Sequence, residues 1–350
     1  MKIFYAVTAT GNGHISRAME LLPYLREYGE VDIFLSGSNS SLNIDAPVKY
    51  RSRGLTLFYN CTGKLDYWKI IKGLHPFRIR KEINELPVEK YDLIINDFDY
   101  ITAAACAKKK VPSVQMGHQA SFQSSQTPRP EKRQMIGEWL LKNFAPATHY
   151  IGLHFSRYDD FILPPVIKKD ILDAEPSDKK YITVYLPSYC ESQLEKIFQQ
   201  FKGFNFQIFS FQSKQVRKSS NIQFIPVNKK LFNESFIHCS GIITGGGFET
   251  PAEALHLGKK MICIPIVGQY EQLCNVAALK KLGVPVLKTL DESFSSVFYK
   301  WVEDKNPVSV NYQNSITELL EKLFTWHENG AQKNPSRSFD KLRITGMETA

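Results

Sequence analysis

A run of three glycines, Gly245 to Gly247, stands between a short apolar segment and a segment of helical spacing. Glycine lets the backbone turn sharply and leaves room for a ligand to approach. The helical segment begins near Thr250, with Pro251 suited to its first turn. The free N–H groups and positive dipole end of such a helix attract phosphate. This order of strand, glycine loop and helix therefore predicts a phosphate-binding site.

Polar side chains follow the glycine loop. Glu253 falls near the first turn of the helix, where its carboxylate should repel phosphate, so we expect it to accept hydrogen bonds from the two hydroxyls of a ribose. The alternative is that it only complements the helix dipole. Three more polar residues open the next helical segment, and they can reach a bound sugar or a phosphate: Glu271, Gln272 and Asn275. A solvated helix face would show the same pattern.

A second glycine loop lies near the N-terminus, where Thr10 to His14 read TGNGH between a strand and a helix. The loop lacks the third glycine of the dinucleotide fingerprint, which argues against a nicotinamide enzyme. Histidine is the side chain that most often serves as a general base near neutral pH. We expect His14 to take the proton of an acceptor hydroxyl, with a helix cap or a structural imidazole as the alternative.

A catalytic histidine is usually oriented by a carboxylate. One buried strand candidate ends in the residues Asn-Asp-Phe-Asp, and Asp97 within it is our candidate, because ligands of parallel sheets gather at the carboxyl ends of the strands. Asp99 is an alternative. His118 follows the next apolar segment and reaches the same edge as a third catalytic candidate, and Gln119 beside it can bind the acceptor.

Both halves of the chain alternate short apolar segments with segments of helical spacing, which is typical of parallel α/β sheets. The expected strands of the first half cover 2–7, 31–35, 91–95 and 111–116, and those of the second half cover 181–186, 204–209, 222–226, 241–243 and 260–264. A proline-containing stretch over 151–180 separates the two halves, and we place the domain boundary near 165. We expect residues 331–350 to be a disordered or tag-like tail.

The stretch from Gly241 to Leu279 resembles the donor-binding half of glycosyltransferases of the GT-B fold. It is most similar to the branch of the lipid II N-acetylglucosaminyltransferase (glycosyltransferase family 28-like) and the UDP-glycosyltransferases of plants and animals. The features that carry the resemblance keep their order along the chain: a strand, the glycine loop, Glu253, Gly258, Pro265, Gln272 and Asn275. The GNGH sequence resembles the first glycine loop of the same branch.

The resemblance implies an α/β protein in the GT-B arrangement, with two Rossmann-like domains of parallel sheet facing each other across a cleft. Residues 1–165 would bind the acceptor and residues 166–330 the nucleotide sugar, and a C-terminal helix near 316–326 would cross back to the first domain. The catalytic candidates are His14, Asp97 and His118. The candidate substrate ligands are Gly11, Gly13, Gln119, Gly245, Gly246, Gly247, Phe248, Thr250, Glu253, Glu271, Gln272 and Asn275.

The resemblance also implies the reaction: inverting transfer from a nucleotide sugar, which we expect to be a UDP-sugar, with no metal and no further cofactor. Many UDP-glycosyltransferases place a phosphate-binding histidine where this chain has Gly245. We expect backbone amides, the helix end or a basic residue to neutralise the diphosphate instead, since His238 precedes the strand. Asp97-Phe98-Asp99 has the spacing of a metal-binding Asp-x-Asp motif, but it falls in the expected acceptor domain, where we interpret it as acid–base orientation.

Composition limits the setting. No apolar run is long enough to cross a bilayer and no signal peptide is evident, so we expect a cytoplasmic protein. The net charge of +9 is spread over both halves and suits anionic ligands or an anionic membrane face, but no helix concentrates it for nucleic acid. The stretch 67–81 mixes aromatic and basic residues and could dock at the inner membrane face, although we prefer a core helix with a solvated basic face.

We therefore expect a glycosyltransferase that passes a sugar to a hydroxyl of a glycan or a lipid-linked acceptor, as in the synthesis of cell-envelope polysaccharide. Two alternatives use the same scaffold: an enzyme like UDP-N-acetylglucosamine 2-epimerase, and a non-catalytic protein that binds a sugar or a lipid. Incubation with donor alone separates the first alternative, because an epimerase still makes product without an acceptor.

Overall fold

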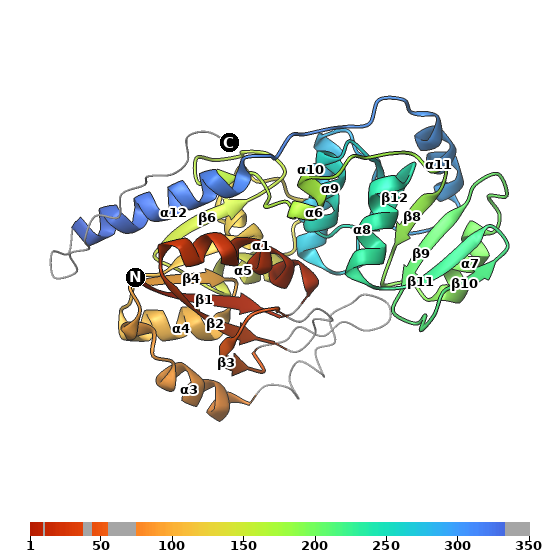
Figure 1. Cartoon of the computed structure of the whole chain (residues 1–350). Coiled ribbons are helices and arrows are strands. Elements are labelled where there is room, and N and C mark those ends of the chain that lie inside the picture. The colour runs from red at the N-terminus through yellow and green to blue at the C-terminus, as the bar shows by residue number, and fades with distance from the viewer. Residues whose placement is uncertain (10, 38–43, 55–74, 333–350) are drawn as a thin grey trace.

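A computed structural model of the chain describes residues 1–9, 11–37, 44–54 and 75–332 (Figure 1). Two sheets follow one another along the chain, and helices cover both. The first sheet ends at Leu163 and the second begins at Ile182. The boundary that we placed near 165 stays a prediction, as does the nature of the tail, most of which lies outside the described residues.

The first sheet has the strand order β3-β2-β1-β4-β5-β6-β7, and its pairings are parallel. Its strands are β1 (Lys2–Thr8), β2 (Glu30–Ser36), β3 (Val48–Ser52), β4 (Leu93–Asp97), β5 (Val114–Gly117), β6 (His149–Leu153) and β7 (Ile162–Leu163). The chain winds in opposite directions from β1, first through β2 and then through β4. The carboxyl ends of β1 and β4 therefore flank the switch point at which α/β sheets bind ligands.

The helices of the first half are α1 (Asn12–Tyr28), α3 (Pro76–Glu85), α4 (Tyr100–Lys109) and α5 (Met135–Asn143), with short 3₁₀ turns η1 (Val88–Lys90) and η2 (His118–Gln123). Asp99 caps α4, because its side chain accepts a hydrogen bond from the Thr102 N–H at 2.6 Å. Of the stretch 67–81, residues 67–74 lie outside the described residues. Pro76 is the first residue of α3, a position that suits proline because the first N–H group of a helix has no partner within the helix.

The second sheet has the order β10-β11-β9-β8-β12-β13. Its strands are β8 (Ile182–Tyr185), β9 (Phe206–Ser210), β10 (Arg217–Ser219), β11 (Ile222–Pro226), β12 (Gly241–Gly245) and β13 (Lys260–Ile264). The expectation of a wholly parallel sheet is wrong at one edge, where β10 pairs antiparallel with β11. Only Ser220 and Asn221 join the two strands, and Ser220 has a φ of 54°. So short a turn reverses the chain and allows only an antiparallel pair.

The helices of the second half are α6 (Lys169–Leu172), α7 (Glu191–Phe198), α8 (Lys229–His238), α9 (Glu249–His256), α10 (Tyr270–Lys281), α11 (Ser293–Glu303) and α12 (Ser315–Gln332). The last helix, α12, returns to the first sheet as predicted (Figure 1). Phe324 of α12 stacks on Tyr28 with ring centroids 3.7 Å apart, and Trp326 stacks on His149 at 5.0 Å. A surface hollow of about 480 Å³ is lined in part by His149 and Trp326, and no candidate site residue lines it.

Within the described ranges, none of the helices combines the length and the apolar character needed to span a membrane.

A cluster of phenylalanines holds α7, α11 and the second sheet together. Phe298 on α11 is fully buried, and its ring centroid lies 4.5 Å from that of Phe201 and 5.6 Å from that of Phe294. Aromatic pairs at these separations add to the free energy gained by burying their area. The cluster fixes the outer layer of the second sheet and so supports the strands that carry the candidate site.

We predict that Phe298→Ala lowers the free energy of unfolding by about 3–5 kcal/mol, because it removes a buried ring and leaves a cavity. Urea unfolding followed by circular dichroism measures the change. Phe77→Ala is the matched control, since the Phe77 side chain is 90% exposed. Equal unfolding midpoints for the two variants would contradict the described packing.

Candidate active site

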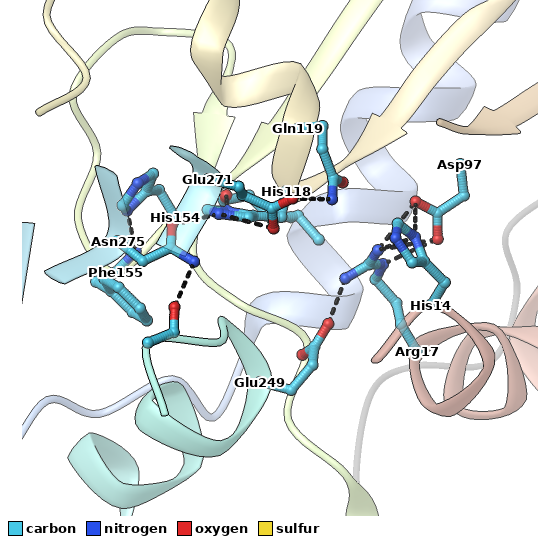
Figure 2. Close-up of polar contacts among 12 residues, drawn as sticks. His14, Arg17, Asp97, His118, Gln119, His154, Phe155, Glu249, Glu271 and Asn275 are labelled. Atoms are coloured by element: carbon cyan, nitrogen blue, oxygen red, sulfur yellow. Dashed lines mark hydrogen bonds and ion pairs between the residues drawn. The ribbon is translucent and has the colours of Figure 1, made fainter. Parts of the chain in front are cut away.

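The first glycine loop brings His14 to the end of strand β4. His14 lies in the first turn of α1, and Asp97 is the last residue of β4. The Nδ1 atom of His14 lies 2.9 Å from Oδ1 of Asp97 (Figure 2). The Asp97 side chain is fully buried, and that of His14 is 12% exposed. The structure thus brings together the histidine and the aspartate that the sequence analysis paired.

Arg17 joins this pair, and the sequence analysis missed it. Its Nη2 atom lies 2.9 Å from both carboxylate oxygens of Asp97, and its Nε atom lies 3.2 Å from Oδ2. The guanidinium is buried, with 2% of the side chain exposed. The spacing could have identified Arg17, because it follows His14 by three residues and residues three apart share a helix face. That face is otherwise apolar, with Ile15 and Ala18 beside Arg17.

The charges of this cluster decide where the protons lie. Burial by itself would raise the pKa of Asp97, but the charges of Arg17 and His14 outweigh it and hold that pKa below its ordinary value. Nδ1 of His14 also lies 3.1 Å from Nη2 of Arg17. A protonated ring nitrogen cannot accept a hydrogen bond, so only one of the two contacts is a hydrogen bond. The ionised carboxylate favours the tautomer that donates Nδ1–H to Asp97, which leaves Nε2 free to accept a proton.

His118 contacts the second half of the chain instead of the His14–Asp97 pair. Its Nε2 atom lies 2.7 Å from Oδ1 of Asn275, and its Nδ1 atom lies 3.0 Å from the carbonyl oxygen of Leu153. The ring stacks on Phe248 with centroids 3.9 Å apart and planes inclined by 9°. Burial lowers the pKa of His118, and the charge of Glu271 offsets this only in part. Its catalytic role stays a prediction, while the geometry makes it a link between the two sheets.

The second glycine loop follows β12 and leads into α9. A Cβ atom added at Gly246 would lie 2.9 Å from Cγ1 of Val276 and 3.1 Å from the carbonyl oxygen of Gln272, so no larger residue fits there without a shift. Asn275 Nδ2 donates a hydrogen bond to the Gly246 carbonyl at 3.0 Å. Gly247 and Gly11 differ, because a Cβ atom at either would meet no atom of the described residues within 4 Å. The loop is therefore packed on α10 at Gly246 and open at Gly247.

The polar residues of α10 already have partners. Glu271 Oε2 accepts a hydrogen bond from Gln119 Nε2 at 3.2 Å, and Gln272 Oε1 accepts one from the Ile266 N–H at 2.8 Å. The first contact joins a predicted acceptor ligand to a predicted donor ligand. Gln119 is 4% exposed, and its Oε1 atom finds no hydrogen-bond partner among the residues that the structure describes. That oxygen is an acceptor group that a substrate hydroxyl can satisfy.

Glu253 is buried on α9, and the nitrogen of Lys168 lies 3.0 Å from its Oε1 atom. Burial raises the pKa of Glu253, and the charge of Lys168 opposes that rise. If Glu253 binds the ribose hydroxyls as predicted, its carboxylate contacts both those hydroxyls and Lys168. Thr250, in the first turn of the same helix, is partly exposed.

Glu249, the first residue of α9, is the second residue that the sequence analysis missed. Arg17 Nη1 donates a hydrogen bond to Oε1 of Glu249, which links the two halves of the chain (Figure 2). A Cβ atom added at Gly13 would lie 3.0 Å from Cγ of Glu249. The sequence signal is weak, because a carboxylate at a helix start is usually a complement to the dipole. Glu249 nevertheless lies directly between the two glycine loops.

The family model described as Glycosyl transferase family 1 matches residues 1–301 of the chain. No curated protein sequence matches this chain significantly.

Solved structures resemble most of the chain. MurG of Acinetobacter baumannii has 14% sequence identity and a TM-score of 0.53, with 93% of this chain and 99% of that chain covered. Arabidopsis thaliana UGT89C1, solved with quercetin, has 13% identity and a TM-score of 0.56, with 96% and 97% covered. The glycosyltransferase VinC, solved with DTDP, has 11% identity and a TM-score of 0.53, with 94% and 100% covered. The predicted GT-B fold and the predicted resemblance are confirmed.

We predict that Arg17→Met lowers the free energy of unfolding at pH 7 by about 3–5 kcal/mol, because it leaves a buried, ionised carboxylate without its cation. Asp97 has a depressed pKa in the folded state, so its contribution to stability is present above its unfolded pKa and is lost as the pH falls. The difference between the variant and the wild type should therefore persist down to about pH 4 and shrink as the pH falls below that value. Urea unfolding at several pH values measures it.

Arg157→Met is the matched control. Arg157 pairs with Glu318, but its side chain is 52% exposed, so its removal should cost less than about 1 kcal/mol. A cost for Arg17→Met as small as that of the control would show that Asp97 does not depend on Arg17.

Proposed function

We propose, because the chain belongs to glycosyl transferase family 1, that it transfers a sugar from a UDP-sugar to an acceptor hydroxyl, with inversion and without a metal ion. The chain is a glycosyltransferase of GT-B type, and this proposal adds its donor and mechanism. One observation carries it: the His14–Asp97 pair of the first half meets the glycine loop and α9 of the second half through Arg17 and Glu249.

The donor would bind at the second glycine loop. Gly247 leaves open space beside the start of α9, and the N–H groups of that helix end attract phosphate. Glu253, on the same helix, is the proposed partner of the ribose hydroxyls. The structures of VinC with DTDP and of SpnG with thymidine diphosphate support a nucleoside diphosphate as the ligand class. The preference for uridine rests on the resemblance to UDP-glycosyltransferases.

The acceptor would bind against the first half, beside His14 and Gln119. The proposed base is Nε2 of His14, since Nδ1 is held by Asp97. Gln119 presents a buried oxygen that can accept a hydrogen bond from an acceptor hydroxyl. We propose a glycan or a lipid-linked acceptor, as in cell-envelope synthesis. The net charge of +9 supports work at an anionic surface such as the inner membrane face.

In the proposed reaction His14 Nε2 removes the proton of the acceptor hydroxyl while that oxygen attacks the anomeric carbon. The bond between this carbon and the diphosphate oxygen breaks on the opposite face, so the configuration inverts and the electron pair leaves with the diphosphate. The N–H groups at the start of α9 would stabilise the charge that develops on the leaving group. The nucleotide sugar is then the only small molecule required besides the acceptor.

The partners of the two aspartates with Asp-x-Asp spacing, Asp97 and Asp99, support metal independence. Asp97 binds Arg17 and His14, whereas Asp99 caps α4 through the Thr102 N–H. Phe98 between them has a φ of 62°. Each carboxylate already has its own partners, and Asp99 is committed to a helix end.

We predict that one nucleoside diphosphate of a panel of UDP, GDP and dTDP raises the melting temperature by a few degrees, with or without EDTA. Binding to the native state alone must stabilise it, by about 2.7 kcal/mol at a ligand concentration of 100 Kd. Glu253→Ala should lose the shift, because the ribose loses its acceptor. Glu191→Ala, which removes a carboxylate from the first turn of α7, should keep it. No shift with any nucleotide would contradict the donor site.

We predict that His14→Ala lowers the acceptor-dependent rate of nucleoside diphosphate release by about 10²–10⁴-fold, because the transition state loses its general base. The assay uses as donor the nucleotide sugar whose nucleoside diphosphate binds, together with a panel of glycan and lipid-linked acceptors. The Kd for the diphosphate should change little.

His238→Ala is the control for this variant, because His238 bonds to Ser177 away from the glycine loops. Full activity in His14→Ala would shift the role of base to His118. Formation of a new sugar from the donor alone would favour the epimerase-like alternative instead.

A further inference from the structure

Glu249 occupies the place where the two glycine loops approach each other. It comes two residues after Gly247 and opens α9, and its Cγ atom fills the space beside Gly13 that a Cβ would need. About a fifth of its side chain, 19%, is exposed. A diphosphate bound at this helix end would lie close to the Glu249 carboxyl group, which no step of the proposed reaction uses.

Among the residues that the structure describes, the groups around Glu249 carry little positive charge to offset that of an anionic ligand. Arg17 and His14 face it from α1, Asp97 from β4 and Glu253 from its own helix, while Tyr5 on β1 is a neutral phenol whose pKa burial raises above its usual range. Lys168 already pairs with Glu253. In the described part of the chain, the Arg17 guanidinium is shared between the Asp97 and Glu249 carboxyl groups. The diphosphate of a nucleotide sugar would add two more negative charges.

The protonation of Glu249 is already close to balance near neutral pH. Burial raises the pKa of its carboxyl to about 7, and Glu253 and Asp97 add to that rise, while Arg17 opposes it. A new negative charge within a few ångströms favours the neutral form further. The carboxyl has two oxygens with different uses, since Oε1 accepts the hydrogen bond from Arg17. A proton on Oε2 turns that oxygen into a donor.

We propose that Glu249 takes up one proton from solvent when the nucleotide donor binds, and that its Oε2–H group then donates a hydrogen bond to a phosphate oxygen. This inference rests on the proposed donor site. It gives the chain a neutral hydrogen-bond donor to the diphosphate at a loop whose first residue, Gly245, has no side chain. The proton stays on Glu249 during transfer, because the leaving diphosphate gains further negative charge as the glycosidic bond breaks.

Proton uptake ties donor affinity to pH. Where free Glu249 is ionised, each bound donor must bring a proton with it, so the Kd rises as the pH increases. Between pH 7.5 and 8.5 the expected weakening is roughly ten-fold, the limit for one linked proton. Glu249→Gln carries an amide that donates a hydrogen bond at every pH and keeps an oxygen for Arg17. Its Kd should be independent of pH over this range.

Isothermal titration calorimetry of the full chain with UDP at pH 8.0 tests the inference. UDP is used because its phosphates are fully ionised at this pH, with the second pKa of a phosphate near 6. The same titration in two buffers with different ionisation enthalpies counts the protons taken up. We expect nearly one proton per UDP for the wild type, and almost none for Glu249→Gln at equal or tighter affinity.

Proton uptake that persists in Glu249→Gln would overturn the inference, because the proton would then reside on another group such as His14. Binding to the wild type without proton uptake would overturn it as well, while leaving the donor site intact. If the wild type binds none of UDP, GDP and dTDP, the proposed donor site itself is wrong. A melting temperature for Glu249→Gln within a few degrees of the wild type establishes that the variant is folded.

Discussion

The buried carboxylate of Asp97 needs a positive partner, because an isolated ionised group in a protein interior costs far more free energy than one folded domain can spare. Arg17 is that partner, and the rest of the site depends on how its guanidinium is shared. Its Nε and Nη2 atoms hold Asp97, and its Nη1 atom reaches Glu249 in the other half of the chain. One buried cation therefore fixes the end of β4, the first turns of α1 and the start of α9. The catalytic geometry proposed for His14 follows from that convergence.

The same constraint explains where glycine is required. A Cβ atom at Gly117 would lie 2.6 Å from Oδ1 of Asp97, and one at Gly13 would lie 3.0 Å from Cγ of Glu249. Both contacts are too close for a side chain without movement of a group that Arg17 holds. Gly247 is different, because the space beside it is open. Glycine thus serves two purposes: it makes room for the polar network in the first half, and at Gly247 it leaves the backbone uncovered by the described residues in the second.

The sequence predicts the fold and half of the polar cluster, and the physical reason for the division is clear. Alternating apolar segments determine strand order only locally, but the carboxyl ends of parallel strands share one edge, which is why His14 and Asp97 could be paired across 83 positions of sequence. The contact of Arg17 with Glu249 spans 232 positions and depends on how two separate sheets meet. The hydrophobic periodicity of the sequence contains no information about how the two sheets pack against each other. The antiparallel strand β10 was missed because three residues are too few for a periodic signal.

Polar contacts between the halves also suggest how a closed arrangement can accept substrates. The predicted acceptor ligand Gln119 pairs with the predicted donor ligand Glu271, and the catalytic candidate His118 pairs with Asn275. A hydrogen bond of this kind contributes only about 0.5–1.5 kcal/mol net, because water or a ligand replaces the lost partner. The apolar contact between Phe155 and Phe248, with ring centroids 5.1 Å apart, has no such replacement. The polar pairs can therefore be exchanged at small cost, whereas the aromatic contact between Phe155 and Phe248 keeps the two halves in register.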